Sequence, residues 1–359
     1  MKERCLMISS FMAEHKTNYV YCILALIKKF HQNGDEIVFV FPKAKTSASW
    51  VDEIRQEGCK VYFLEYKPYS LNNINFVKKI IRDEKINLVQ SDYTGWDITV
   101  KLAKPFMPTI WYEMMRVNDK DKVKKYENLI KYKIIGAFNT YPVGISDDVY
   151  NSLCRLSYKS RCKKIYNSLD VSRFDLSRPR TKNSVKTYLM FSYSPMVKGV
   201  DIVCDAMEEL NRDGVKAKLI IVSHGANDDY LNNRYKKLPE WLTVETPRSD
   251  VQHYYLLADS FISASRSEGF SFSLLEALYT GMGCVVSDIP GTAWSESFKG
   301  IRYFESGNSG SLVEALKNDI EFEINQEEVD FNRQKTLKDF SFDGWVDQVF
   351  GFHKKIMNK

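Results

Sequence analysis

Residues 260–287 read SFISASRSEGFSFSLLEALYTGMGCVVS, and this stretch decides the fold class. Its start, Ser260–Ala264, is a largely apolar run that predicts a buried strand, and Cys284–Ser287 predict a second strand. The helical period of Ser273–Tyr279 between them ends at Gly281, a residue typical of the position after a helix. A strand, a helix and a strand joined by short turns form a β-α-β unit, whose two strands lie parallel in one sheet.

The same alternation extends from this unit in both directions along the chain of 359 residues. The expected strands are apolar on both faces, as in a parallel sheet that helices cover on its two sides. The fold class is therefore α/β. Strands are expected at 5–9, 36–41, 60–64, 86–90, 109–112, 143–146, 187–191 and 218–222, and helices at 19–31, 51–57, 73–83, 96–103, 147–153, 200–210, 251–258, 310–318 and 342–356.

The alternation is interrupted once, by the polar segment 173–186 that contains Pro179. A chain of this length exceeds one ordinary hydrophobic core, so we interpret the interruption as the connection between two domains. Ligands of such sheets bind at the carboxyl ends of the strands. The predicted organisation is an N-terminal domain at 1–174, a linker at 175–186, a C-terminal domain at 187–341 and a last helix at 342–359.

The composition argues against several classes of function. The net charge of +5 is mild, so nucleic acid is not an expected partner. The seven Cys and five His show no spacing typical of metal ligands, so no metal is expected, and reduced core thiols indicate a cytoplasmic location. The D-x-D sequence Asp119-Lys120-Asp121 lies at a Lys-rich helix start and is interpreted as a solvated surface. No apolar run reaches the roughly 20 residues that a membrane-spanning helix needs.

The candidate chemistry lies in residues 265–276, at the carboxyl end of a predicted strand. Gly269, after Glu268, lets the backbone approach a ligand closely. Ser271 is expected to cap the following helix, whose first N–H groups favour a bound phosphate. Glu276, about one turn into that helix, can accept hydrogen bonds from two neighbouring hydroxyls, as on a ribose. Two Glu at this spacing are, by themselves, also compatible with a solvated helix face.

Four segments in the expected order resemble motifs of the retaining GT-B glycosyltransferases of glycosyltransferase family 4. The resemblance implies a GT-B fold, in which two Rossmann-like domains face each other across a cleft and the last helix crosses back to the first domain. The segments are Glu268–Glu276, similar to the E-x7-E motif; residues 165–174 (IYNSLDVSRF), similar to I-P-N-G-V-D-x-x-x-F; residues 194–201 (SPMVKGVD), similar to S-x-x-K-G-v-d; and residues 146–149 (SDDV), similar to S-e-x-v.

The resemblance also implies roles for single residues on the donor side. Lys198 would contact the diphosphate of the donor and stabilise the negative charge that builds on the leaving nucleotide. Glu268 would contact the donor sugar, and Glu276 would hold the ribose. Further candidates for donor binding are the backbones of Gly269 and Phe270, together with Ser271, Gly225 in the loop Ser223-His224-Gly225, and Arg248.

Two departures from the family pattern concern charge and loop shape. Ser192-Tyr193 stand where the family has Gly-Arg, so one positive charge is missing, and Arg266 is the hypothesised replacement. The first loop, residues 9–16, contains no Gly although the family loop is Gly-rich. Acceptor-side candidates are His15, Asp92 and Glu113, and for Asp92 and Glu113 a neutral core or surface role is an open alternative.

The activity implied by the resemblance is transfer of a sugar, with retention, from a nucleotide sugar such as a UDP-sugar, without a metal or cofactor. The expected acceptor is a glycan, a lipid-linked bacterial surface glycan or a glycoprotein. Residues 119–137 combine Lys with apolar side chains and could lie on an anionic membrane at the inner face of the plasma membrane. The alternative is a helix packed on its domain. Two other functions stay open: a non-catalytic GT-B subunit that binds a glycan or partner protein, and a nucleotide-sugar epimerase.

Overall fold

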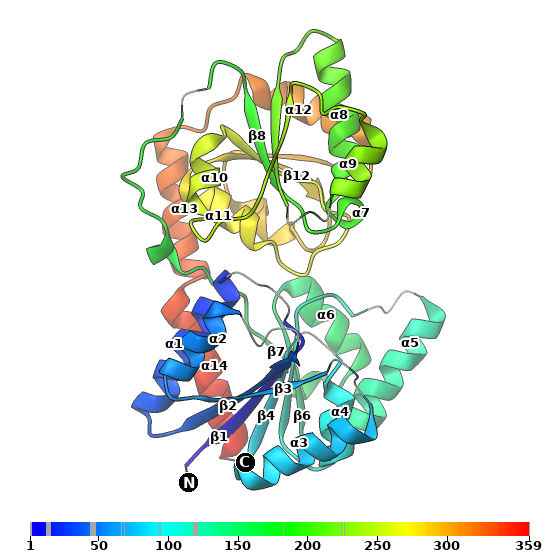
Figure 1. The fold of residues 1–359 in the computed structure, drawn as a ribbon, viewed down its shortest axis with the longest axis vertical. Coiled ribbons are helices and arrows are strands. Elements are labelled where there is room, and N and C mark those ends of the chain that lie inside the picture. Colours follow the sequence, from blue (N-terminus) through cyan, green and yellow to red (C-terminus); the bar gives the residue numbers. More distant parts are fainter. Residues whose placement is uncertain are drawn as a thin grey trace. The chain divides into compact units, whose positions relative to one another are not determined.

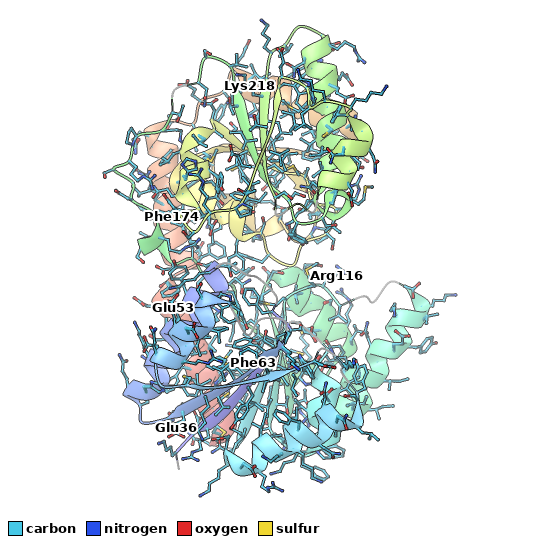
Figure 2. The ribbon with its side chains drawn as sticks, in the orientation of Figure 1. Glu36, Glu53, Phe63, Arg116, Phe174 and Lys218 are labelled. Carbon is cyan, nitrogen blue, oxygen red and sulfur yellow. The ribbon has the colours of Figure 1, made fainter. Side chains whose placement is uncertain are left out.

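The computed structural model describes residues 2–11, 16–43, 48–65, 67, 69–92, 95–117, 121–181, 183–223, 225 and 227–358. Contacts divide the chain into two compact units (Figure 1). Unit 1 comprises Met1–Asp170 and Phe342–Lys359, and unit 2 comprises Val171–Ser341. In each unit side chains fill the space between a central sheet and the helices that cover it (Figure 2).

Unit 1 contains, among its described residues, a seven-stranded sheet in the order β3-β2-β1-β4-β5-β6-β7, with all strand pairs parallel. Its strands are β1 (Arg4–Ser9), β2 (Glu36–Pro42), β3 (Lys60–Leu64), β4 (Leu88–Asp92), β5 (Thr109–Glu113), β6 (Thr140–Gly144) and β7 (Lys163–Lys164). Its helices are α1 (Asn18–Gln32), α2 (Ser49–Gln56), α3 (Leu71–Asp83), α4 (Asp97–Ala103), α5 (Lys122–Leu129), α6 (Asp147–Leu156) and α14 (Phe342–Met357), with short turns η2 (Ile130–Ile134), η3 (Ile135–Ala137) and η4 (Lys159–Arg161).

The core of unit 1 follows from the alternation of side chains along its strands. Leu6 and Ile8 of β1 pack in one cluster with Val77 of α3 and Val100 of α4. Helices α1 and α14 contact each other, with the rings of α1 Phe30 and α14 Phe350 5.1 Å apart. Both faces of the sheet are therefore covered, which explains why the strands are apolar throughout.

The last helix, α14, is tied to unit 1 by hydrogen bonds as well as by packing. Trp345 Nε1 donates to the Tyr112 hydroxyl at 3.0 Å, and His353 Nε2 lies 2.6 Å from Gln90 Oε1. These contacts join residues that are more than 200 positions apart in the chain. The helix is thus an integral part of the unit that holds the N-terminal half of the sequence, up to Asp170.

Unit 2 contains, within the described ranges, a six-stranded parallel sheet in the order β10-β9-β8-β11-β12-β13. Helices α8 and α12 contact each other on a core that includes strand residues Met190, Ile221, Ile262 and Val285. The strands are β8 (Thr187–Phe191), β9 (Lys218–Val222), β10 (Leu242–Glu245), β11 (Ser260–Ser263), β12 (Gly283–Asp288) and β13 (Ile301–Glu305). The helices are α7 (Pro195–Lys198), α8 (Val200–Arg212), α9 (Asp228–Arg234), α10 (Gln252–Leu257), α11 (Phe272–Thr280), α12 (Ser309–Ile320) and α13 (Gln326–Asp339), with short turns η5 (Val171–Arg173) and η6 (Ala293–Ser297).

Helix α13 was not predicted from the sequence, which reads there as a polar stretch. Its start is fixed by a capping box, in which Asn325 and Glu328 satisfy each other's backbone N–H groups. Its buried side chains include Asn332 and Thr336, so it packs largely through polar groups. Asn332, for example, bonds the backbone of Lys299 at 2.9 and 3.0 Å. A search for apolar periodicity cannot detect a helix of this kind.

The segment 175–186, expected as a linker, is hydrogen-bonded to unit 2 along most of its length. Arg178 contacts Asp250 at 2.9 Å, and Thr181 N donates to Leu256 O at 2.8 Å. Its polar composition thus reflects attachment by hydrogen bonds instead of apolar packing. Among the described helices, none is both long and apolar enough to cross a bilayer.

Candidate functional site

Each sheet has one place where the strand order reverses, and ligands of open α/β sheets bind beside the carboxyl ends of those strands. In unit 1 this place lies between β1 and β4, and in unit 2 between β8 and β11. The segments that follow β8 and β11 carry Lys198 and Glu268. The motif residues of unit 2 are therefore at the switch point of its own sheet.

The loop between β11 and α11 is held by glycines on two neighbouring segments. Gly199 has a φ of +71°, and a Cβ there would lie 2.2 Å from the carbonyl oxygen of Ala264. A Cβ on Gly291 would lie 2.1 Å from the carbonyl oxygen of Glu268. The Ser287 hydroxyl also donates to Ser265 O at 2.7 Å. Both close approaches need glycine, because a backbone carbonyl cannot move away cheaply.

Lys198 and Glu268, which are 70 positions apart in the chain, form an ion pair in this loop. Lys198 is the last residue of the short helix α7, and its Nζ contacts Glu268 Oε1. Ser265 Oγ donates to the same oxygen at 2.8 Å. The Lys198 ammonium also lies 4.7 Å from the ring centroid of Tyr193. Both charged side chains are largely buried. The loop therefore holds one lysine ammonium in direct contact with one carboxylate.

Glu276 lies on α11, buried and held by two donors. Arg173 donates to its Oε1 at 2.8 Å, and the Tyr255 hydroxyl donates to its Oε2 at 2.7 Å. Burial, followed by the charge of Glu276, raises the pKa of Tyr255. Each carboxylate oxygen keeps a second lone pair, so the carboxylate is oriented without being saturated. Sequence reasoning missed Tyr255 and Arg173, although Arg173 lies inside the quoted segment 165–174.

The start of α11 has the geometry expected for a helix cap. Ser271 is the N-cap residue, and its Oγ accepts a hydrogen bond from Leu274 N at 3.4 Å. The helix ends at Gly281, which is in the left-handed region with a φ of +87°. Next to the cap, the Phe270 ring is buried and stacks on Trp294 at 4.8 Å. The Phe270 side chain thus serves the core, and any ligand contact of Gly269 and Phe270 would come from their backbones.

Three other donor-side candidates take no part in this ion pair. The Arg266 guanidinium bonds both carboxylate oxygens of Asp201, at 2.7 and 2.6 Å. A bidentate pair of this kind engages the fork of the guanidinium, so this geometry does not favour Arg266 as the missing phosphate ligand. Gly225, with a φ of +80°, follows β9, and the exposed Arg248 follows β10. Both therefore lie near the carboxyl ends of strands of the unit 2 sheet.

The acceptor-side candidates belong to unit 1, where His15 lies outside the described residues. Asp92, at the end of β4, is fully buried and bonds the Tyr19 hydroxyl at 2.5 Å and Gln90 Nε2 at 3.0 Å. Burial raises the pKa of Asp92 to about 7 despite these bonds. Gln90 in turn contacts His353 of α14, and burial lowers the pKa of His353 to about 3. Asp92 therefore belongs to a buried polar chain, the core alternative that the sequence left open.

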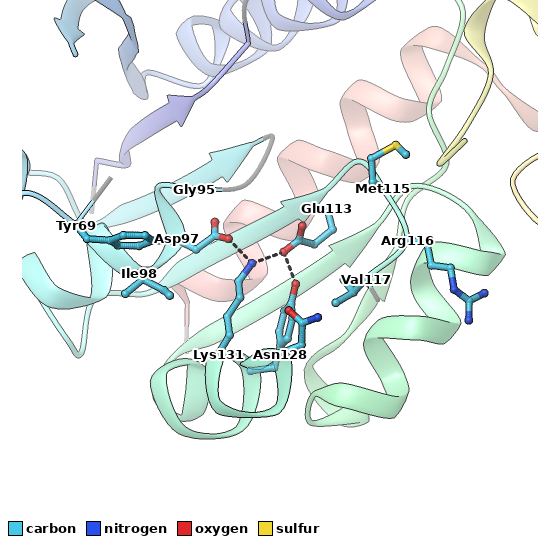
Figure 3. A pocket seen from close by; sticks show the side chains of 11 residues that line it. Tyr69, Gly95, Asp97, Ile98, Glu113, Met115, Arg116, Val117, Asn128 and Lys131 are labelled. Carbon is cyan, nitrogen blue, oxygen red and sulfur yellow. Dashed lines mark hydrogen bonds and ion pairs between the residues drawn. The ribbon is translucent and has the colours of Figure 1, made fainter. Parts of the chain in front are cut away.

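Glu113, at the end of β5, lines a pocket of about 410 Å³ in unit 1 (Figure 3). Its Oε1 accepts from Lys131 Nζ at 3.0 Å and from the Tyr132 hydroxyl. Lys131 also pairs with Asp97 Oδ2 at 2.6 Å. Burial opposes the charge of Lys131, but Asp97 and Glu113 outweigh it and raise the pKa of the ammonium. Sequence reasoning singled out Glu113 without these partners, because they come from α4 and from the π-helical turn η2.

The described part of the chain contains no group of three or more His, Cys, Asp or Glu side chains arranged to hold a metal ion. Asp121, the described member of the D-x-D sequence, caps α5 by accepting from Lys124 N at 2.8 Å.

Comparison with known proteins gives a family match within unit 2. Residues 186–321 match the profile of the family described as glycosyl transferases group 1. A comparison with curated protein sequences gives no match. The domain match and the fold together support a GT-B glycosyltransferase.

Solved structures similar to this chain cover nearly all of it. A glycosyltransferase from Rickettsia africae has 17% identity and a TM-score of 0.78, with 99% of each chain covered. HepE of Anabaena in complex with UDP has 14% identity and a TM-score of 0.77, over 99% of this chain and 100% of that one. Its complex with UDP-glucose has 13% identity and a TM-score of 0.77, over 98% and 99%. The predicted GT-B fold, with two Rossmann-like domains, is confirmed.

Proposed function

We propose that this protein transfers a glycosyl group, with retention at the anomeric carbon, from a nucleotide sugar to a hydroxyl group of an acceptor. The observation that carries the proposal is the Lys198–Glu268 pair at the switch point of unit 2, inside the matched residues 186–321. A UDP-sugar is the first choice of donor, and this choice is supported by the similar HepE structures, whose ligands are UDP and UDP-glucose.

In the proposed reaction Lys198 binds the diphosphate and offsets the charge that develops as the bond between the sugar carbon and the phosphate oxygen breaks. Glu268 contacts the sugar, and Glu276, oriented by Arg173 and Tyr255, accepts hydrogen bonds from the ribose hydroxyls. The acceptor oxygen bonds the sugar carbon on the face that the phosphate leaves. Its proton passes to the leaving phosphate, so no metal or cofactor is required.

The direct test measures UDP-sugar turnover and UDP binding for Lys198→Met. Loss of a charge-stabilising group at the leaving phosphate is expected to reduce turnover about 100-fold or more. Lys216→Met is the matched control, because Lys216 is an exposed lysine of unit 2 outside the site. Turnover and UDP affinity that stay unchanged in both Lys198→Met and Glu276→Ala would contradict the site assignment.

Two other functions predict different results in the same assays. A non-catalytic subunit of this fold would bind neither UDP nor GDP in calorimetry, and Tyr193 in place of the family Arg is the observation that favours it. An epimerase would release free sugar or an epimer when no acceptor is present. Transfer of labelled sugar to an acceptor, with UDP as the second product, excludes both.

The exposed surface of α5 and η2 favours an acceptor that is linked to a lipid in an anionic membrane. Helix α5 buries none of its side chains, although a helix packed on its domain would bury one face. Four apolar side chains of α5 and η2 stay exposed among lysines, namely Val123, Tyr126, Ile130 and Ile134, which are between 51% and 68% exposed. This surface suits the headgroup region of a membrane. In a flotation assay, the protein is expected to rise through the gradient together with anionic vesicles. A variant with these four residues changed to Ser should remain in the bottom fraction. If the unmodified protein does not float, membrane binding through this surface is excluded.

A further inference from the structure

The pocket of unit 1 in which Lys131 bridges Asp97 and Glu113 combines groups whose hydrogen bonding is incomplete. Glu113 is 2% exposed and lines the pocket, and its Oε1 already holds two donors. Its other oxygen, Oε2, accepts no hydrogen bond from any residue that the structure describes. Since Glu113 lines the pocket, this oxygen is available to accept a hydrogen bond from a ligand.

The ammonium beside it supplies the complementary group. Lys131 Nζ donates to Glu113 Oε1 and is ion-paired with Asp97 Oδ2 at 2.6 Å, and across the described residues no other oxygen accepts a hydrogen bond from it. An available acceptor and an available donor thus lie on neighbouring side chains 3.0 Å apart. A hydroxyl group both donates and accepts, so two adjacent hydroxyls of one ligand match this pair.

The charge of the pocket selects against anions. Lys131 faces two carboxylates, and Arg116, the other cation in the lining, is paired with Asp148. No surplus positive charge is left for a phosphate or a carboxylate. A divalent cation is also disfavoured, because the ammonium already occupies the place between the two carboxylates (Figure 3).

The pocket has an aromatic ring at its rim and is large enough for a small molecule. Tyr69, whose side chain is half exposed, lies with Ile98 on one side of the charged groups, and Met115 with Arg116 on the other (Figure 3). The volume of about 410 Å³ is in the range of small-molecule sites. An aromatic ring next to a few buried polar groups suits a ring compound that has an apolar face and a hydroxyl-bearing edge.

We propose that this pocket binds a neutral pyranose unit of the acceptor, with neighbouring hydroxyls on Glu113 and Lys131 and an apolar sugar face on Tyr69. The proposal rests on the proposed function, since it names the chemical class of the acceptor. Asp97 acts as a positioning residue, because Ser91 Oγ holds it at 2.5 Å while it holds Lys131. Acceptors whose terminal unit is a neutral sugar are therefore preferred over acceptors that end in a phosphorylated or acidic sugar.

The experiment measures saturation transfer from the full-length protein to methyl glucoside, methyl galactoside, glucosamine and glucose 6-phosphate. At least one neutral methyl glycoside is expected to bind, and Glu113→Gln should weaken its binding about tenfold or more, because a hydrogen bond to a charged group is lost. Tyr69→Ala should weaken it about fivefold. Tyr158→Ala is the control, since it removes a partly exposed ring of unit 1 outside the pocket.

The same variants separate this proposal from the proposed function. Glu113→Gln and Tyr69→Ala should leave UDP affinity within about twofold of the unmodified protein, whereas Lys198→Met should weaken UDP binding and leave glycoside binding intact. Tyr69→Ala keeps the test valid if Glu113→Gln does not fold, because Tyr69 is at the rim. The proposal is overturned if no neutral glycoside binds, if both variants bind it as the unmodified protein does, or if glucosamine or glucose 6-phosphate binds in its place.

Discussion

Both units place a carboxylate near the carboxyl end of a parallel strand and set a lysine against it, but the balance of charge differs. In unit 2 Lys198 faces a single carboxylate, Glu268. In unit 1 Lys131 is shared between Glu113 and Asp97. A third carboxylate, Asp92 of β4, has no cation paired with it among the residues that the structure describes, and it is bonded by Tyr19 and Gln90 instead.

This difference in charge underlies the ligand that is proposed for each of the two sites. A lysine that balances one carboxylate can turn toward an incoming diphosphate, which brings more negative charge than it displaces. A lysine held by two carboxylates offers a ligand a hydrogen-bond donor without net positive charge. Similar residues at similar places in two related sheets thus favour a phosphate in unit 2 and hydroxyl groups in unit 1. Variants that alter one charge at a time test whether this difference between the two units is real.

The largest effect on stability is expected for Lys131→Met. It leaves two buried carboxylates without a cation, and breaking a buried ion pair in this way costs about 3–5 kcal/mol of unfolding free energy. Lys198→Met should cost less, because it leaves one carboxylate that still accepts from Ser265. Urea unfolding at pH 7 measures both. The triple variant Lys131→Met, Asp97→Asn, Glu113→Gln should recover much of the loss, and equal losses in the two single lysine variants would break the comparison.

The next largest effect concerns Asp92 and depends on pH. Burial raises its pKa to about 7, so the folded protein holds a proton that the unfolded chain releases near pH 4. The stability from this proton is present below about pH 4 and is lost as the pH rises through about 7. A shift of about three pKa units corresponds to about 4 kcal/mol at most. Asp92→Asn should flatten this part of the profile and unfold at higher urea than the unmodified protein at pH 8; an unchanged slope would contradict the raised pKa.

The fold was largely predictable because parallel strands covered on both faces give apolar runs that helical periods separate. The prediction of 273–279 as a helix ended by Gly281 is confirmed by α11, which begins one residue earlier and ends one residue later. Helix α13 and the segment 175–186 were not recognised for what they are. Both attach to the rest of unit 2 through hydrogen bonds. The sequence alone does not distinguish a polar side chain that bonds a distant residue from one that is solvated.

The site was predictable to the extent that its residues lie close in sequence. Gly269, Ser271 and Glu276 share one strand–loop–helix connection, so their proximity follows from local structure. The partners Arg173 and Tyr255 reach Glu276 from 103 and 21 positions away, and Lys131 reaches Glu113 through a π-helical turn. No local pattern encodes such pairs, because they depend on how helices pack on the finished sheet.

A smaller effect is expected from glycines that have the same backbone conformation but different surroundings. Gly199 and Gly214 have φ values of +71° and +84°, and only Gly199 has a backbone carbonyl where a Cβ would lie. Gly214→Ala should therefore cost about 1 kcal/mol from backbone strain alone. Gly199→Ala adds overpacking against Ala264, for a total of about 2–4 kcal/mol, and should also reduce donor turnover. Thermal unfolding of the two variants is the measurement. Equal losses of unfolding free energy would mean that the loop after β11 shifts to accept the added Cβ at little cost.

The smallest expected effect comes from adding the charge that the family pattern has and this chain lacks. Tyr193 is largely exposed and lies beside Lys198, so an Arg there places a second cation next to the proposed diphosphate site. Tyr193→Arg should tighten UDP binding about fivefold to tenfold, corresponding to about 1 kcal/mol, and most strongly at low salt. Tyr193→Phe should bind UDP as the unmodified protein does, and Tyr303→Arg, elsewhere on unit 2, controls for a general change of charge. If UDP binds more weakly to Tyr193→Arg, the repulsion between Arg and Lys198 outweighs the gain, and the single lysine balanced by Glu268 is the better diphosphate site for this chain.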